Sequence, residues 1–335
     1  MPKPPIKLVV PKLRDPRLTL AAGLTTWTIF GQTFLYFNRD PFQIAVALVT
    51  GCALDMILSF VLYRQILIPI SAYISCLSLG ILIASPDWRV FAVASVWAIL
   101  SKYLLRVGDR HFFNPSNFAI VATVLLSHGV ATVAPGSQWG GDYRVAVLIL
   151  VLGLMMMKRV NRLDLVLAWI GGYVVMSLIR VALGQGGLVF ALGPMTGAEF
   201  ALFTFSMIPD PKTNPPTRGA RIVWGLAIAL VDGILRYNEV RYSMFYALVG
   251  LCAVLPIFRM IAAARGIRET DPWKVAVMVM SGKSGDASPD AALAAAMTTA
   301  APGSSVVRAT GVGAIPVAAS TAQSGSPTRG GASAE

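Results

Sequence analysis

Long apolar runs recur through the first 260 residues, and they limit what this chain can fold into more than any other feature. A run of about 18 or more residues with few charges is long enough to cross a hydrocarbon layer ~30 Å thick. Only 13% of the residues are charged, compared with roughly 25% in soluble domains. The sequence therefore predicts an all-α, polytopic integral membrane protein that passes repeatedly through the cell membrane (a plasma or inner membrane).

We predict ten transmembrane helices in a domain covering residues 18–260. A basic, extended segment, residues 1–17, precedes them. Residues 281–335 are rich in Ala, Gly, Ser, Thr and Pro and are expected to be a disordered tail, because they cannot bury enough apolar surface to offset their chain entropy. The eighth helix is short because prolines follow it, and we expect it to extend back into residues 184–193. The ten expected ranges are 18–37, 42–62, 66–84, 88–105, 115–134, 143–157, 164–183, 198–208, 222–237 and 242–258.

The distribution of Lys and Arg sets the expected orientation. With both termini in the cytoplasm, nineteen Lys and Arg residues fall at inner loops and helix ends and six at outer ones. Such an excess on the inner side is typical of multi-pass membrane proteins. The net charge of +12 is explained in the same way, so we expect the lipid bilayer as a partner and no nucleic acid.

The cysteines and histidines exclude several kinds of cofactor site. Cys52, Cys76 and Cys252 each stand alone in an apolar run. Without paired cysteines or Cys/His spacing, we expect no disulfide framework, iron–sulfur cluster or other metal site. The two histidines are too few for a multi-haem protein.

The first polar loop, KYLLRVGDRHFFNPSNF, covers residues 102–118. Pro115 suits the first turn of a helix, which makes Asn114 its expected N-cap. Asn117 lies one turn further on, facing into the membrane, and an aromatic pair precedes Asn114. Amide side chains beside aromatic ones at a helix N-terminus suit a planar heterocycle or an anion.

The second polar loop, PDPKTNPPTR, covers residues 209–218 and has similar chemistry. Asp210 and Lys212 supply charge, Thr213 supplies a hydroxyl, and the prolines stiffen the backbone. Both loops are expected on the cytoplasmic side. Rigid polar loops at membrane depth are tolerated where they line a cavity or are buried in protein.

Two acidic residues lie within apolar runs. Asp55 must find a partner or a proton inside the bundle, either as a waypoint for a cation or proton or as a structural residue. Asp232 precedes Arg236 by four residues, which places both on one helical face and predicts an ion pair.

These loops resemble those of the NqrB/RnfD family, the flavin-carrying membrane subunits of the sodium-pumping NADH:quinone reductase and the Rnf electron-transport complex. Lys102 followed by residues 113–116, F-N-P-S, is similar to the family's Lys, glycine-rich turn and F-N-P-A. Residues 208–213, I-P-D-P-K-T, are similar to its A-T-D-P-V-T. The similarity covers roughly residues 40–260 and the same number of spans. Further matching positions are Asp55, Ser71-Ala72 and Leu235-Arg236.

The sequence also departs from the family. Members with covalent FMN attach it to the threonine of an S-G-A-T signature in the outer loop after the fifth span. Here that loop holds only Ala131-Thr132, and covalent FMN is not expected. The glycine-rich turn is replaced by R-V-G-D-R-H. The chain thus resembles the family's shorter branch without the signature, some of whose members occur with enediyne-biosynthesis genes.

The resemblance implies a membrane subunit of an electron-transport complex, working with other membrane redox subunits as part of an oxidoreductase or translocase and not as a complete enzyme. It would bind a non-covalent flavin (FMN or riboflavin) or a quinone at the inner loops. The implied cofactor-binding residues are Lys102, Asn114, Asn117, Asp210, Lys212 and Thr213, with Asp55 in an ion pathway. The alternative is a permease or export component of a biosynthetic pathway without a redox role.

Overall fold

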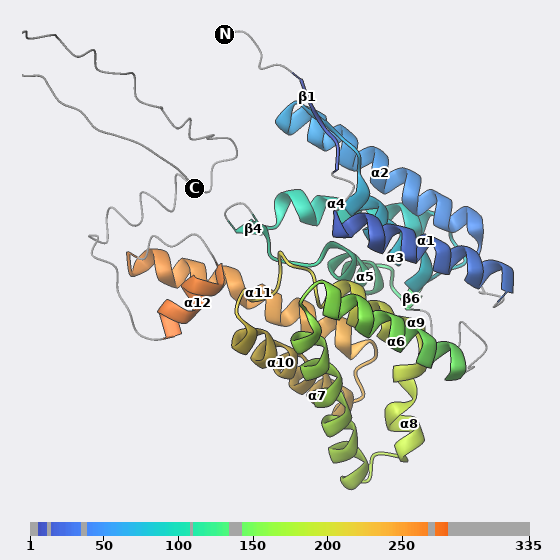
Figure 1. Ribbon diagram of the computed structural model, residues 1–335, viewed down its shortest axis with the longest axis vertical. Helices are drawn as coiled ribbons and strands as arrows, with labels where there is room; N and C mark the ends of the chain where they lie inside the picture. Colours follow the sequence, from blue (N-terminus) through green and yellow to red (C-terminus); the bar gives the residue numbers. More distant parts are fainter. Residues whose placement is uncertain are drawn as a thin grey trace, which may run out of the picture.

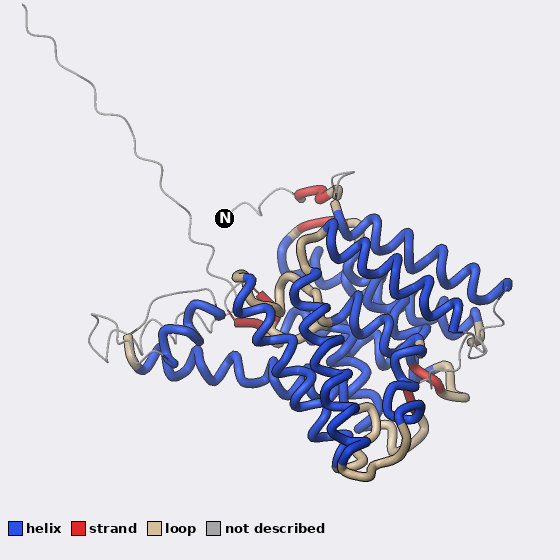
Figure 2. The backbone as a smooth tube through the Cα atoms, turned by 60° about the horizontal axis from the view of Figure 1, so that its bottom comes forward, coloured by secondary structure: helices blue, strands red, loops and turns tan. Residues whose placement is uncertain are grey.

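A computed structural model describes residues 6–11, 15–34, 39–107, 110–133, 143–266 and 272–280. The chain is mostly helical, as the apolar runs predict, and its short strands form three two-stranded pairs (Figures 1 and 2). The predicted disordered tail, residues 281–335, lies outside the described residues.

The first half of the bundle is built around α3. Its side chains are buried almost throughout, because it packs against four other helices of this half. Pro41 and Pro115 each occupy a first helical turn, behind N-caps supplied by Asp40 and Asn114. The helices are α1 (Pro16–Phe34), α2 (Pro41–Tyr63), α3 (Ile70–Leu82), α4 (Arg89–Leu104) and α5 (Pro115–Leu126).

The second half is held together by close packing of α7 against α10. A Cβ added to Gly225 would lie 2.7 Å from the carbonyl oxygen of Leu165, so only glycine permits this approach. Asp164 and Arg221 join the same two helices through a bidentate ion pair, with a shortest distance of 2.7 Å. The elements are α6 (Tyr143–Arg159), α7 (Leu163–Ala182), α8 (Leu188–Leu192), η1 (Gly193–Thr196), α9 (Ala198–Leu202), the π-helix η2 (Phe203–Met207), α10 (Arg218–Tyr237), α11 (Ser243–Ala264) and α12 (Pro272–Met280).

The short strands connect parts of the chain that are distant in sequence. β1 (Lys7–Val9) lies parallel to β2 (Gln65–Leu67), which fixes part of the N-terminal segment over the loop between α2 and α3. β3 (Ile83–Ala84) pairs with β6 (Thr132–Val133) beyond the C-terminal ends of α3 and α5. β4 (Arg106–Val107) and β5 (Arg110–His111) form a hairpin that leads the chain from α4 to the start of α5.

Apolar helices suited to a membrane occur in both halves. Among the described residues, α2, α7 and α11 have the length and hydropathy to cross one. The segments Leu188–Thr196 and Glu199–Met207 make a fourth such span if they are taken together, although they meet at a bend of 63°. The eighth predicted helix therefore does continue toward residue 188, but through a sharp bend. Each of the ten expected ranges contains helix, while ten complete spans and the orientation of the termini stay predictions.

Candidate functional site

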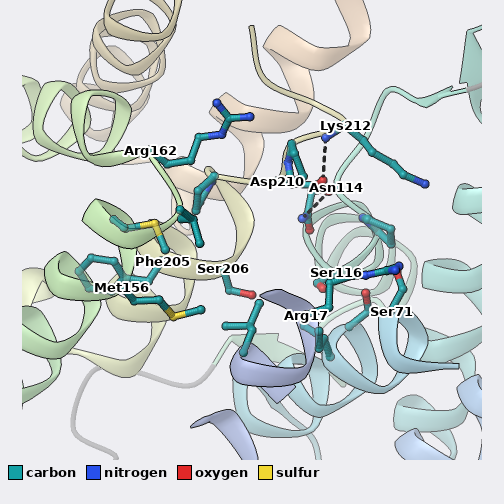
Figure 3. Close-up of a pocket in the computed structure, with 18 of the residues that line it drawn as sticks. Arg17, Ser71, Asn114, Ser116, Met156, Arg162, Phe205, Ser206, Asp210 and Lys212 are labelled. Carbon is teal, nitrogen blue, oxygen red and sulfur yellow. Dashed lines mark hydrogen bonds between the residues drawn. The ribbon is translucent and has the colours of Figure 1, made fainter. Parts of the chain in front are cut away.

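A cavity of about 400 Å³ lies between the two polar loops (Figure 3). The start of α5 and the loop after η2 form part of its wall, together with residues from α1, α3 and α6. Four of the lining side chains are serines and five are charged. The residues that line it are Asp15, Arg17, Leu20, Ser71, Ile74, Ser75, His111, Asn114, Pro115, Ser116, Met156, Met157, Val160, Arg162, Phe205, Ser206, Pro209, Asp210, Pro211 and Lys212.

Asn114 ties the two polar loops together. Its Oδ1 accepts a hydrogen bond from the backbone N–H of Asn117 at 3.1 Å, which confirms the predicted N-cap. Its Nδ2 donates to Oδ2 of Asp210 at 3.2 Å, across 96 residues of sequence (Figure 3). The amide thus stabilises the cavity wall while its side chain lines the cavity.

Asp210 organises the second loop. Its Oδ1 accepts a hydrogen bond from the backbone N–H of Lys212 at 3.0 Å, and its carbonyl oxygen accepts one from Nδ2 of Asn214 at 2.8 Å. Burial raises the pKa of the Asp210 carboxyl, while the bond from the Lys212 N–H, the charge of Lys212 and the Asn114 bond lower it. The loop is therefore folded around one carboxylate at the edge of the cavity.

Three cations line the cavity from separate elements: Arg17 from α1, Arg162 from the α6–α7 turn and Lys212 from the second loop (Figure 3). Arg17 is 57% exposed and pairs with Asp15 at 2.6 Å. Together with Asp210, these groups give the cavity two carboxylates and three positive side chains, an excess of positive charge suited to a ligand that carries or gains negative charge.

Part of the cavity wall is apolar, with Met156 and Phe205 lying close together on the same side as Arg162 in Figure 3. Phe205 belongs to the π-helix η2, and a Cβ added to Gly153 would meet its ring at 2.5 Å. Gly153 therefore leaves the space that this ring occupies beside α6. Single-turn π-helices occur frequently at functional sites.

His111 is 5% exposed and lines the cavity from the end of β5. Its Nδ1 lies 2.9 Å from the carbonyl oxygen of Phe113. Burial, followed by the charges of Lys212, Lys102 and Arg106, lowers the pKa of the imidazole to about 3. The ring is therefore neutral at pH 7.

Two residues of the predicted site, Asn117 and Thr213, are buried behind the cavity wall. Asn117 donates from Nδ2 to the carbonyl oxygen of Phe245 at 3.1 Å, and Thr213 donates from Oγ1 to the carbonyl oxygen of Asp210 at 3.3 Å. Neither lines the cavity. Their donor groups are used by backbone carbonyls, whereas Oδ1 of Asn117 has no hydrogen-bond partner among the described residues. Their expected role as direct ligands stays a prediction.

Lys102 and Asp55 form a separate cluster between α2 and α4. Lys102 Nζ lies 2.8 and 3.0 Å from the two carboxylate oxygens of Asp55, and Tyr103 Oη donates to Oδ1 at 2.8 Å. Asp55 is completely buried and Lys102 does not line the cavity. The contacts give Asp55 the partner that a buried carboxylate requires, and its place in an ion pathway stays a prediction. The predicted pair of Asp232 and Arg236 is confirmed at 3.0 Å.

Several cavity residues carried no sequence signal for a site. In the sequence, Arg17 and Arg162 belong to the charges that set the expected orientation. Met156 and Phe205 belong to the apolar runs. Outside the two loops, Ser71 is the lining residue that matches the family pattern. These residues lie near the two loops because α1, α3, α6 and η2 pack around the cavity. No local sequence pattern predicts that packing.

Taken together, fold and site define a mostly helical protein whose described residues include three or four helices suited to a membrane and a polar cavity between two loops. Comparison with models of known protein families finds no match, and comparison with curated proteins finds none either. The resemblance to the NqrB/RnfD family thus rests on the loop motifs, and a function is proposed from the site.

Proposed function

We propose that this chain is a ten-span membrane subunit of an electron-transport complex, with both termini in the cytoplasm, and that it holds a non-covalent flavin or a quinone in the cavity. The observation that carries the proposal is that the cavity is walled by both polar loops, joined by the hydrogen bond from Asn114 to Asp210. These are the loops through which the sequence resembles a family of flavin-carrying subunits.

The cavity suits a planar redox ring in size and in lining. Its 400 Å³ falls within the roughly 300–1,000 Å³ of small-molecule pockets. Met156 and Phe205 offer an apolar surface to a ring face, while Asn114, Lys212 and the serine hydroxyls offer polar groups to ring edges. An apolar surface with a few convergent polar groups is the usual composition of a cofactor site.

When bound, a flavin or quinone supplies the redox chemistry, and the protein supplies position and electrostatics. Arg17, Arg162 and Lys212 stabilise negative charge that develops in the cavity, and the apolar wall excludes water from one side. We propose that other membrane redox subunits supply and accept the electrons. No cation movement is assigned to Asp55, because Lys102 already neutralises its carboxylate.

A flavin in this cavity would be separate from Thr132, the residue nearest in pattern to a covalent FMN site. Thr132 is exposed on β6, which pairs with β3 at the C-terminal end of α3, whereas Ser71 and Ser75 line the cavity from the first half of that helix. The eight residue steps from Ser75 to Ile83 separate the two places by about 12 Å at ~1.5 Å per residue.

The test is an absorption spectrum of the full chain purified in detergent, before and after acid precipitation. We expect flavin or quinone absorption that is released into the acid supernatant, and no fluorescent band on a denaturing gel. Ser206→Trp, which places a large ring in the cavity, should abolish binding. Thr217→Trp, at an exposed position of the second polar loop outside the cavity lining, is the control and should retain binding.

The runner-up is a permease or export component, favoured by the 63° bend between Leu188–Thr196 and Glu199–Met207. Broken helices beside polar cavities are common in transporters. Purified wild-type protein that releases no flavin or quinone, and binds neither when it is added, would make this the leading function.

A further inference from the structure

His111 has one ring nitrogen that the fold leaves free. A carbonyl oxygen can only accept a hydrogen bond, so the contact between Nδ1 and the Phe113 carbonyl oxygen requires the proton to be on Nδ1. In the neutral ring, Nε2 then carries a lone pair and acts as an acceptor. Within the part of the chain that the structure describes, no hydrogen bond to Nε2 is found.

This acceptor is at the cavity. His111 lines it, and the side chain is more than nine-tenths buried, so the cavity is where Nε2 can meet a partner. A donor on a molecule in the cavity would gain a hydrogen bond to this acceptor. Burial, and after it the positive charges of Lys212, Lys102 and Arg106, lowers the pKa of the imidazole and so keeps Nε2 an acceptor.

We propose that Nε2 of His111 accepts a hydrogen bond from a ring N–H or O–H of the molecule held in the cavity, so that the site selects ligands carrying such a donor. The inference rests on the proposed function and specifies its ligand chemistry. Oxidised flavin has one such donor, N3–H, between two carbonyl groups, and Lys212 is a cationic donor in the same cavity for such carbonyls. An oxidised quinone has carbonyl acceptors alone, and only its reduced form carries O–H donors.

The test compares ligands that differ at that donor. Binding of riboflavin and of N3-methylriboflavin to the detergent-purified full chain would be measured by quenching of flavin fluorescence. A parallel series would use a short-chain benzoquinone in its oxidised and reduced forms under anaerobic conditions. One hydrogen bond changes affinity by roughly two- to twelvefold. We therefore expect the ligand that carries the donor to bind more tightly by at least about twofold.

Two substitutions of His111 distinguish the effect of losing the Nε2 acceptor from the effect of changing the loop structure. His111→Phe and His111→Gln both remove the Nδ1 bond to Phe113, but the Gln side chain can place a carbonyl oxygen near the position of Nε2. We expect His111→Phe to weaken riboflavin binding by two- to twelvefold while leaving N3-methylriboflavin unchanged. His111→Gln should retain most of the discrimination.

The outcomes distinguish this inference from the proposed function. If wild type binds riboflavin and N3-methylriboflavin equally, or binds oxidised and reduced quinone equally without binding flavin, the role of His111 is refuted while a redox cofactor site stands. Discrimination that is as large in His111→Phe as in wild type also refutes it. If none of these ligands binds, both proposals fail.

Discussion

The buried pair of Asp55 and Lys102 gives the sharpest prediction about stability. Asp55 has 0% of its side chain exposed and Lys102 has 17%, and Nζ is 2.8 Å from the nearer carboxylate oxygen. Replacing Lys102 by Met leaves a buried carboxylate with only Tyr103 as a hydrogen-bond donor. Breaking a buried pair from one side costs about 3–5 kcal/mol.

We therefore expect Lys102→Met to lose about 3–5 kcal/mol. At roughly 2–4 °C per kcal/mol, this lowers the unfolding temperature by about 6–20 °C. The assay is the fraction of detergent-purified protein that stays monodisperse after heating, measured by size-exclusion chromatography.

The double variant Asp55→Leu/Lys102→Met tests the same pair by removing both charges. Replacing both partners by apolar groups removes the uncompensated charge, so its stability should lie within about 1 kcal/mol of wild type. Lys158→Met, at an exposed position near the end of α6, controls for the loss of a cation. A cost below 1 kcal/mol for Lys102→Met, or a double variant no more stable than the single one, would contradict a structural ion pair.

Three further predictions concern the loops. Asn114→Ser should retain the helix cap but lose the bond to Asp210, so in the same heating assay it should be more stable than Asn114→Ala by about 1 kcal/mol and less stable than wild type. His111 is neutral when folded and protonates near pH 6.5 when unfolded, so folding loses stability as the pH falls below 6.5, about 1.4 kcal/mol by pH 5.5. His111→Gln should flatten this dependence, and an unchanged slope would assign it to other groups. With the native cysteines replaced, Thr217→Cys should be labelled only from the cytoplasmic side and Glu239→Cys only from outside. Labelling of Thr217→Cys in intact cells would reverse the proposed orientation.

The helices were predictable because their signals are local. Apolar runs mark each of the ten ranges that contain helix, and Pro115 after Asn114 marks the start of α5. The pair of Asp232 and Arg236 follows from a spacing of four residues on one helix. In each case the information lies within a few turns of sequence, where helix geometry determines which residues meet.

The site was predictable only in part because its walls are distant in sequence. Both polar loops could be recognised, but Asn114 and Asp210 are 96 residues apart and nothing local indicates that they bond. Lys102 and Asp55 were assigned separate roles, although the fold pairs them with each other. Side-chain pairing across a bundle depends on helix rotation and register, which the composition of each run leaves open.

The ion pair of Asp164 and Arg221 has a consequence for how the chain is made. The two residues are 57 positions apart, so during synthesis α7 is complete long before its partner exists. At about 5–20 residues per second, the carboxylate waits roughly 3–11 s for the guanidinium. During that interval α7 cannot pack against α10, and the Asp164 carboxylate has no guanidinium to pair with. Slower synthesis near the start of α10 would prolong this unpaired stage.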